Sequence, residues 1–264
     1  MLPFAAALAL SLPLAFAAPA AAAPRLTDAQ AEALGRLIWR NEGQGKVENL
    51  TAWNRGEDFA SLGIGHFIWY PQGRAGPFTE SFPPMARFLA ARGAPLPTWA
   101  LAEHCPWSDR ASFQADLAGP RLTELRAALA ATTALQARHI ADRSEAALPL
   151  LLDGLPPARQ AELRARYEAV AAAANGVYAL VDYVNFKGEG VSASERYDGL
   201  GWGLRQVLEE MDGAAAPGQP AVLAFSRAAA AVLRRRVEHS PPARGESRWL
   251  PGWLSRVKTY ETPL

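Results

Sequence analysis

The chain has 264 residues, of which 50% are hydrophobic and 20% are charged, and its formal net charge is +1. This composition is typical of a globular protein with one sizeable core or two small ones. A net charge so close to zero gives no electrostatic attraction to nucleic acid or to an anionic surface, so we expect neither as a partner.

The first 23 residues contain no charged side chain and are rich in Ala and Leu. Their apolar stretch is short and is followed by small residues, which is typical of a secretory signal peptide and not of a membrane span. We therefore expect residues 1–23 to be a signal peptide and residues 24–264 to form one domain. The protein is then expected to be periplasmic or secreted, without membrane contact after cleavage. An uncleaved anchor is the alternative.

A first helix is expected to begin after Thr27. Thr27 and Gln30 have the spacing of a capping box, and apolar residues recur at helical spacing from Ala31 onwards. Gly43 can adopt the left-handed conformation that stops a helix. Glu42 then lies on the last turn, where the backbone carbonyl groups favour the protonated form of a carboxyl group, as a general acid requires.

The middle of the chain is expected to contain loops and several helices. After a glycine-rich hairpin at residues 61–66, Gly, Pro and aromatic residues predict loops and one short helix at residues 85–91. Residues 108–174 predict about three helices, which prolines punctuate at positions 120, 149, 156 and 157. Cys105 is the only cysteine and is expected to pack as a small hydrophobe.

The last third of the chain predicts further helices. Asn175 is expected to cap a buried helix over residues 177–186, which ends at a Gly-Glu-Gly sequence and is followed by a polar loop. Further helices are expected from Gly203 to Met211 and from Pro220 onwards, and residues 249–260 should pack back as an aromatic cap. The predicted fold class is α+β, mostly helical.

Several motifs resemble the phage-type (endolysin) lysozymes. Asn41-Glu42-Gly43 is similar to the Glu-Gly that closes the first helix of that family, and Ser61-Leu62-Gly63-Ile64-Gly65-His66 to its Thr-Ile-Gly-x-Gly-His hairpin segment. Ala179 to Tyr183, Gly203 to Leu208 and Arg234 to Glu238 resemble later helices of the family. The resemblance covers most of residues 27–66 and 178–240 but not residues 75–155. It implies a lysozyme-like helical domain with a small β-hairpin beside the cleft.

The resemblance also implies roles for single residues. Glu42 matches the catalytic acid of the family, Ser61 matches the Thr that helps to hold the attacking water, and His66 matches a structural hairpin histidine. Arg55 stands where the family has its second carboxylate. Glu57 and Asp58 lie in the same loop, and we favour Glu57 as the base. The alternative is that both are surface acids.

Candidate substrate contacts are Trp53, Asp58, His66, Trp69 and Glu189. The two tryptophans flank the hairpin, and aromatic rings stack on the faces of pyranose sugars; the alternative is that both belong to the core. The four histidines have no paired ligand spacing, so no metal site is expected. No nucleotide-binding loop or nucleophile-elbow motif occurs either, and no cofactor is expected.

We therefore interpret the sequence as a monomeric, exported glycosidase that acts on the glycan strands of peptidoglycan. Glu42 would be the general acid at the β-1,4 bond between N-acetylmuramic acid and N-acetylglucosamine. One alternative is a lytic transglycosylase with 1,6-anhydro products, using Glu42 or Glu189. The spacing of Glu189 to Gly203-Leu204-Arg205-Gln206 is similar to the Glu…Gly-Leu-Met-Gln signature of the soluble enzymes of that kind. The other alternative is a non-catalytic glycan-binding protein on a lysozyme scaffold.

Overall fold

The computed structural model describes residues 26–76, 78–192, 195–213 and 215–264. This part of the chain contains ten α-helices and two small antiparallel sheets, with 62% of residues in helices, which confirms the prediction of a mostly helical fold. The predicted signal peptide, residues 1–23, lies outside the described residues. No helix in the described ranges has the length and apolar character that a membrane span requires.

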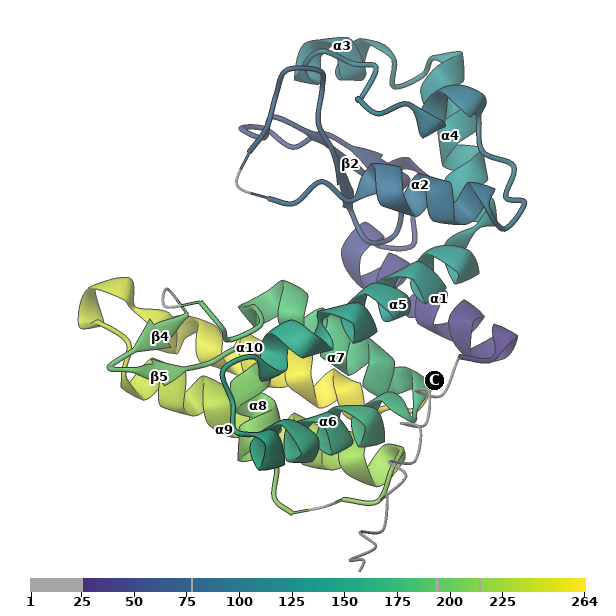
Figure 1. Ribbon diagram of the computed structural model, residues 1–264. Helices are drawn as coiled ribbons and strands as arrows, with labels where there is room; N and C mark the ends of the chain where they lie inside the picture. Colours follow the sequence, from purple (N-terminus) through teal and green to yellow (C-terminus); the bar gives the residue numbers. More distant parts are fainter. Residues whose placement is uncertain (1–25, 77, 193–194, 214) are drawn as a thin grey trace, which may run out of the picture.

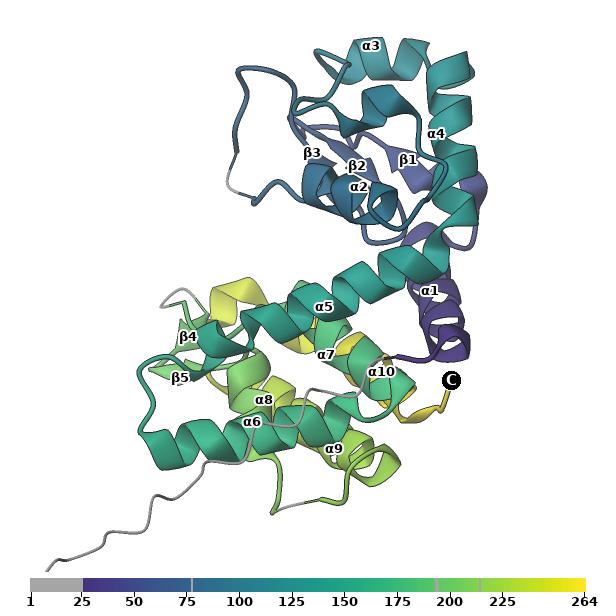
Figure 2. The same cartoon turned by 45° about the vertical axis from the view of Figure 1, so that its right-hand side comes forward.

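The described residues form two lobes, which α1 (Asp28–Gly43) and α5 (Thr133–Leu152) connect (Figures 1 and 2). The first lobe, residues 47–131, holds a three-stranded sheet and three helices. The second lobe, residues 157–261, is almost entirely helical. One continuous cluster of buried side chains extends through both lobes, so α1 and α5 are core elements and not exposed linkers.

The first helix begins as predicted. Thr27 Oγ1 accepts a hydrogen bond from the Gln30 N–H at 3.2 Å, and Gln30 Oε1 accepts one from the Thr27 N–H at 2.9 Å. The role predicted for Gly43 was wrong, because Gly43 is still helical and Gln44 adopts the left-handed conformation, with φ of 56°. A Cβ at Gly43 would lie 2.9 Å from the Trp39 ring. Gly43 is therefore required for close packing against Trp39.

The first lobe contains the predicted hairpin and a third strand. The strands β1 (Thr51–Ala52), β2 (Ala60–Leu62) and β3 (Phe67–Trp69) pair in that order, all antiparallel. The turn between β2 and β3 docks on α5, where the Ile64 N–H donates to Gln136 Oε1 at 2.9 Å. A Cβ at Gly63, whose φ is +72°, would lie 2.4 Å from the same oxygen, so only glycine allows this approach.

The helices of the first lobe and the connecting region differ slightly from the prediction. The short predicted helix is α2 (Phe82–Ala90). Residues 108–174 form four helices where about three were predicted. These are α3 (Arg110–Ala115), α4 (Pro120–Ala131), α5 and α6 (Pro157–Ala171). Pro149 lies inside α5 near its C-terminal end; because proline has no N–H, one helical hydrogen bond is absent there. Burial raises the pKa of Cys105 to about 12, in agreement with a small hydrophobic role.

The second lobe is built around a buried helix, α7 (Ala174–Lys187), which ends at Gly188 as predicted. The predicted cap, Asn175, was wrong: it lies inside α7, and its amide donates to Gln219 Oε1 and to the Tyr260 carbonyl, both at 2.9 Å. The predicted polar loop contains a small hairpin, β4 (Arg196–Tyr197) and β5 (Leu200–Gly201). Next come α8 (Leu204–Glu210), α9 (Gln219–Glu238) and α10 (Leu250–Lys258).

Short 3-10 segments complete the described structure at Val47–Leu50, Thr98–Leu101, Pro242–Arg244, Glu246–Trp249 and Thr259–Glu261. The C-terminal segment packs back onto the second lobe as expected, and Tyr260 is fully buried there. Trp249 is 45% exposed, so not every aromatic side chain of this segment is buried.

Candidate active site

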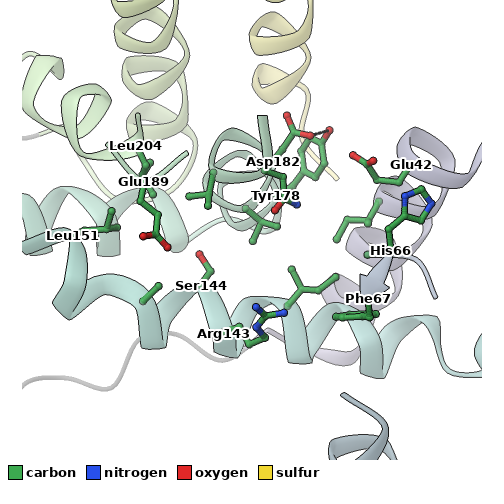
Figure 3. A pocket seen from close by; sticks show the side chains of 17 residues that line it. Glu42, His66, Phe67, Arg143, Ser144, Leu151, Tyr178, Asp182, Glu189 and Leu204 are labelled. Atoms are coloured by element: carbon green, nitrogen blue, oxygen red, sulfur yellow. Dashed lines mark hydrogen bonds between the residues drawn. The ribbon is translucent and has the colours of Figure 1, made fainter. Parts of the chain in front are cut away.

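A pocket of about 340 Å³ lies between α1, α5 and α7, and the turn between β2 and β3 closes one side of it. Its size is within the range of small-molecule binding sites. The polar side chains that line it are those of Glu42, His66, Arg143, Ser144, Tyr178, Asp182, Asn185 and Glu189. Figure 3 shows Glu42 and Glu189 at opposite ends of this pocket, with both carboxyl groups directed into it.

Glu42 lies on the last turn of α1, and its side chain is 33% exposed. Its Oε1 atom is 3.5 Å from Nη2 of Arg256, which belongs to α10. The carboxyl group thus faces the pocket on one side and a guanidinium group on the other.

Asp182 holds the guanidinium group of Arg256. The Asp182 side chain is only 2% exposed, and it accepts hydrogen bonds from Arg256 Nη2 at 2.6 Å and Nε at 2.9 Å. The hydroxyl of Tyr260 donates to it at 2.5 Å, and that of Tyr178 donates to it at 3.1 Å. This buried carboxylate is therefore satisfied by one cation and two phenols, as a buried charge requires.

The pKa shifts of these groups agree with such a network. The hydrogen bonds to Asp182 raise the pKa of Arg256, and the nearby Glu42 acts in the same direction. Burial raises the pKa of Tyr178 and that of Tyr260, and the Asp182 charge adds to both shifts. Both phenols therefore keep their protons and remain donors.

A further hydrogen bond fixes the end of α1. The Asn41 amide donates to the Tyr178 hydroxyl at 2.7 Å, and Asn41 directly precedes Glu42. The last turn of α1 is consequently held against α7 on one side and against α10 through Arg256 on the other. Neither Asp182 nor Arg256 was predicted as a site residue. A charged residue inside the apolar run of α7 was the one available signal, since buried carboxylates need partners.

Glu189 is presented by two glycines in positive-φ conformations, Gly188 at 87° and Gly190 at 83°. The Glu195 carboxylate accepts hydrogen bonds from the Gly190 N–H at 2.7 Å and the Ser192 N–H at 3.2 Å. A Cβ at Gly188 would lie 1.7 Å from Glu195 Oε1 and would displace this carboxylate, and the φ of +87° itself favours glycine. Glu189 thus lines the same pocket as Glu42, from its other end.

The start of α8 supports the same segment. The N–H groups of Leu204 and Arg205 donate to the carbonyls of Gly188 and Glu189, both at 3.0 Å. A Cβ at Gly203 would lie 2.0 Å from the Gly190 nitrogen, so the two backbones touch. We refer to residues 188–190 with Glu195 and Gly203 as the Glu189 mount; its contacts fix where this carboxylate enters the pocket.

The hairpin supplies only one polar residue to the pocket. His66 lines it from the turn between β2 and β3 and has a left-handed backbone, with φ of 47°. Ser61 is buried in β2 and is not part of the lining. Of the three predicted catalytic residues, only Glu42 therefore lies in the pocket.

The two candidate bases also lie outside the pocket lining. The Glu57 carboxylate accepts a hydrogen bond from the Asn54 amide at 3.1 Å, and Asp58 pairs with Arg74 at 2.8 Å. Both acids are in the connection between β1 and β2, whereas His66 is at the other end of β2. Strand direction thus separates these acids from the turn that reaches the pocket.

The two tryptophans predicted as sugar contacts belong to the core. Trp53 is 4% exposed and packs against Phe113, with 5.7 Å between the ring centroids. Trp69 is fully buried against Phe82, at 4.5 Å. Neither ring offers a face to a ligand, so the sugar-contact prediction was wrong for both.

Within the described ranges, no group of three or more His, Cys, Asp or Glu side chains is arranged to hold a metal ion. Comparisons of the chain with protein-family models, with curated proteins and with solved structures find no match. The functional argument therefore starts from the chemistry of the pocket.

Proposed function

We propose that the protein is a peptidoglycan-cleaving glycosidase on a lysozyme-like fold, with Glu42 as its general acid. The observation that carries the proposal is the position of Glu42, on the last turn of α1 with its carboxyl group in a pocket that a second carboxylate, Glu189, lines from the other end. Glycoside cleavage needs a carboxylic acid that protonates the leaving oxygen. The resemblance of the residues around Glu42 and His66 to phage-type lysozymes supports the same assignment.

In this reaction Glu42 donates its proton to the oxygen of the β-1,4 bond while the bond from that oxygen to C1 breaks. Water then attacks C1, and its proton leaves to a base, which gives a reducing end. The side chains of Arg143, Asn185 and Glu189 supply hydrogen-bond donors and acceptors for the hydroxyl and acetamido groups of the sugars. The proposed substrate is the glycan of peptidoglycan outside the cytoplasm, and no cofactor takes part.

Replacement of Glu42 by Gln tests the proposal. Glu42→Gln should lower activity on purified peptidoglycan by about 10²–10⁴-fold, because general acid catalysis contributes a factor of this size. The free energy of unfolding should change by less than about 1 kcal/mol, because the partly exposed contact with Arg256 contributes little. Glu32→Gln, on the exposed face of the same helix, is the control and should keep full activity.

Zymography on a peptidoglycan gel gives the readout. A folded Glu42→Gln protein that still clears the gel would refute the role of Glu42. A wild-type protein that binds peptidoglycan but never clears it would identify the third reading, a glycan-binding protein.

A second candidate function is lytic transglycosylation. It is favoured by one observation: neither Glu57 nor Asp58 lines the pocket that contains Glu42. A transglycosylase needs no carboxylate to activate water, because the 6-hydroxyl of the sugar attacks C1.

Mass spectrometry of the released fragments separates the two reactions. Hydrolysis, which we favour, should give reducing ends. Ends of the 1,6-anhydro type, lighter by one water, would identify a transglycosylase and leave the role of Glu42 intact. Because Glu57 lies outside the pocket lining, Glu57→Gln should keep activity in either case.

A further inference from the structure

A guanidinium group beside Glu42 creates a chemical difficulty for a general acid. Arg256 Nη2 is 3.5 Å from the Glu42 carboxyl group. An adjacent positive charge favours the ionised form of a carboxyl group, whereas a general acid must carry its proton when the substrate binds. The site therefore needs a feature that limits the influence of Arg256 on Glu42.

Asp182 has the geometry for this task. Its carboxylate contacts Arg256 at 2.6 and 2.9 Å, and both contacts are shorter than that between Arg256 and Glu42. The pairing is bidentate, which fixes the plane of the guanidinium group as well as its position. The Phe186 ring lies against the same guanidinium group, with its centroid 4.7 Å from the Arg256 Cζ atom.

Two phenols complete the contacts of the Asp182 carboxylate. Tyr178 and Tyr260 both donate hydrogen bonds to it. Tyr178 also accepts a hydrogen bond from Asn41, so the same network reaches the residue that precedes Glu42.

We propose that Asp182 is a positioning residue, which neutralises and orients Arg256 so that Glu42 keeps its proton. This inference rests on the proposed function, because it gives a role to the Asp182–Arg256 pair only if Glu42 is a general acid. The pair sets the pH range in which Glu42 can act.

The remaining groups around Glu42 are the same in every variant needed for a test. Besides Asp182, the charged or titratable side chains that share its pocket are His66 from the hairpin turn, Arg143 from α5, Tyr178 from α7 and Glu189 from its mount. Tyr178 and Tyr260 are the titratable groups that contact Asp182. Differences between variant and wild type therefore report the Asp182–Arg256 pair alone.

The test compares two substitutions with opposite expected effects. In Asp182→Asn, the charge of Arg256 acts on Glu42 without compensation, so Glu42 loses its proton at lower pH. In Arg256→Met, the cation is absent and the Asp182 carboxylate remains, so Glu42 keeps its proton to higher pH. We expect the alkaline limb of the kcat/KM profile to move by about one pH unit in each case, downwards for Asp182→Asn and upwards for Arg256→Met.

The measurement is the ratio of variant to wild-type kcat/KM on purified peptidoglycan at each pH and constant ionic strength, because this ratio cancels the titration of the substrate. Across the alkaline limb it should fall about tenfold for Asp182→Asn and rise about tenfold for Arg256→Met. Asp28→Asn and Arg36→Met make the same charge changes at exposed positions of α1 and should leave the profile unchanged.

A structural role alone gives a different result. If both substitutions lower activity by the same factor at every pH, or move the limb in the same direction, the inference is wrong while the role of Glu42 stands. Activity of Glu42→Gln would refute the proposed function itself. Should Asp182→Asn not fold, the Asp182→Asn/Arg256→Met double variant removes both charges, and its alkaline limb should lie between those of wild type and Arg256→Met; a limb below that of wild type overturns the inference.

Discussion

His139 is a buried polar residue of α5. Its ring lies between Phe67 and Phe88, at centroid distances of 5.8 and 4.9 Å. Its Nε2 atom has no hydrogen-bond partner among the described residues. Burial lowers the pKa of His139 to about 4, and the nearby Arg143 and Arg92 act in the same direction. The folded protein therefore holds this side chain neutral.

This burial predicts a pH dependence of stability. The pKa of His139 is about 4 in the folded protein and about 6.5 in an unfolded chain. Between these values the unfolded state binds more protons, so the free energy of unfolding should decrease as the pH falls from about 6.5 to about 4. The loss should amount to about 2–3 kcal/mol. Above pH 6.5 this residue should contribute no pH dependence.

Urea unfolding at a series of pH values measures the effect. His139→Leu should remove this part of the pH dependence, whereas His104→Asn, at an exposed position, should keep it. Equal slopes for wild type and His139→Leu over the window would contradict the explanation.

The motif around Glu42 specifies the position of this residue but not the residues that surround it. The motif around Glu42 predicted its place on the last turn of the first helix, because caps and apolar spacing are local signals. The network around Glu42 joins distant parts of the chain. Arg256 is separated from its partner Asp182 by 74 positions, and Asn41 from its partner Tyr178 by 137. Nothing in the sequence around any one of these residues specifies the others.

At the scale of elements, the Glu189 mount depends on contact between two backbones. Gly203 has an ordinary φ of −80°, so the backbone conformation itself would accept alanine. The added Cβ would lie 2.0 Å from the Gly190 nitrogen and 2.3 Å from its Cα. Backbone atoms cannot move away as the end of a flexible side chain can, so the two segments must separate.

We therefore expect Gly203→Ala to lower the free energy of unfolding by about 1–3 kcal/mol, as overpacking in a close contact usually does. Activity should fall as well, because Glu189 would no longer enter the pocket at the same place. Gly252→Ala is the matched control: Gly252 lies in α10, and a Cβ there meets nothing within 4 Å. It should be neutral or stabilising by up to about 1 kcal/mol. Equal stability of Gly203→Ala and wild type would show that the contact is looser than described.

Local signals also explain which elements could be predicted. Thr27, Pro157, Gly188 and Pro220 mark the ends of helices in the sequence, and helices begin or end within one residue of each. Asn175 was misread because an amide that caps a helix and an amide buried inside one are the same residue type. Its partner, the Tyr260 carbonyl, is 85 positions away. The β4–β5 hairpin was missed because its strands are two residues each and carry no alternating pattern.

At the scale of the whole molecule, the order of the chain determines the place of the pocket. The first lobe, residues 47–131, is one continuous stretch between α1 and α5, and both of these helices line the pocket together with α7. The sequence predicted a hairpin near the site and an acid at a helix end. It could not predict that the connection between β1 and β2 would lie away from the pocket, since this depends on how the whole sheet docks on α5 through Gln136.

The contact of Arg256 with Glu42 joins the last helix of the described chain to the first. This contact also bears on the order in which the structure forms. A ribosome synthesises α1 long before α10, so a growing chain contains Glu42 before it contains Arg256. Contacts of such sequence separation form late, because the closure of a long loop must precede them. We therefore expect a growing chain that still lacks α10 to present Glu42 without Arg256, and the contact between the two side chains to form only after α10 has been synthesised.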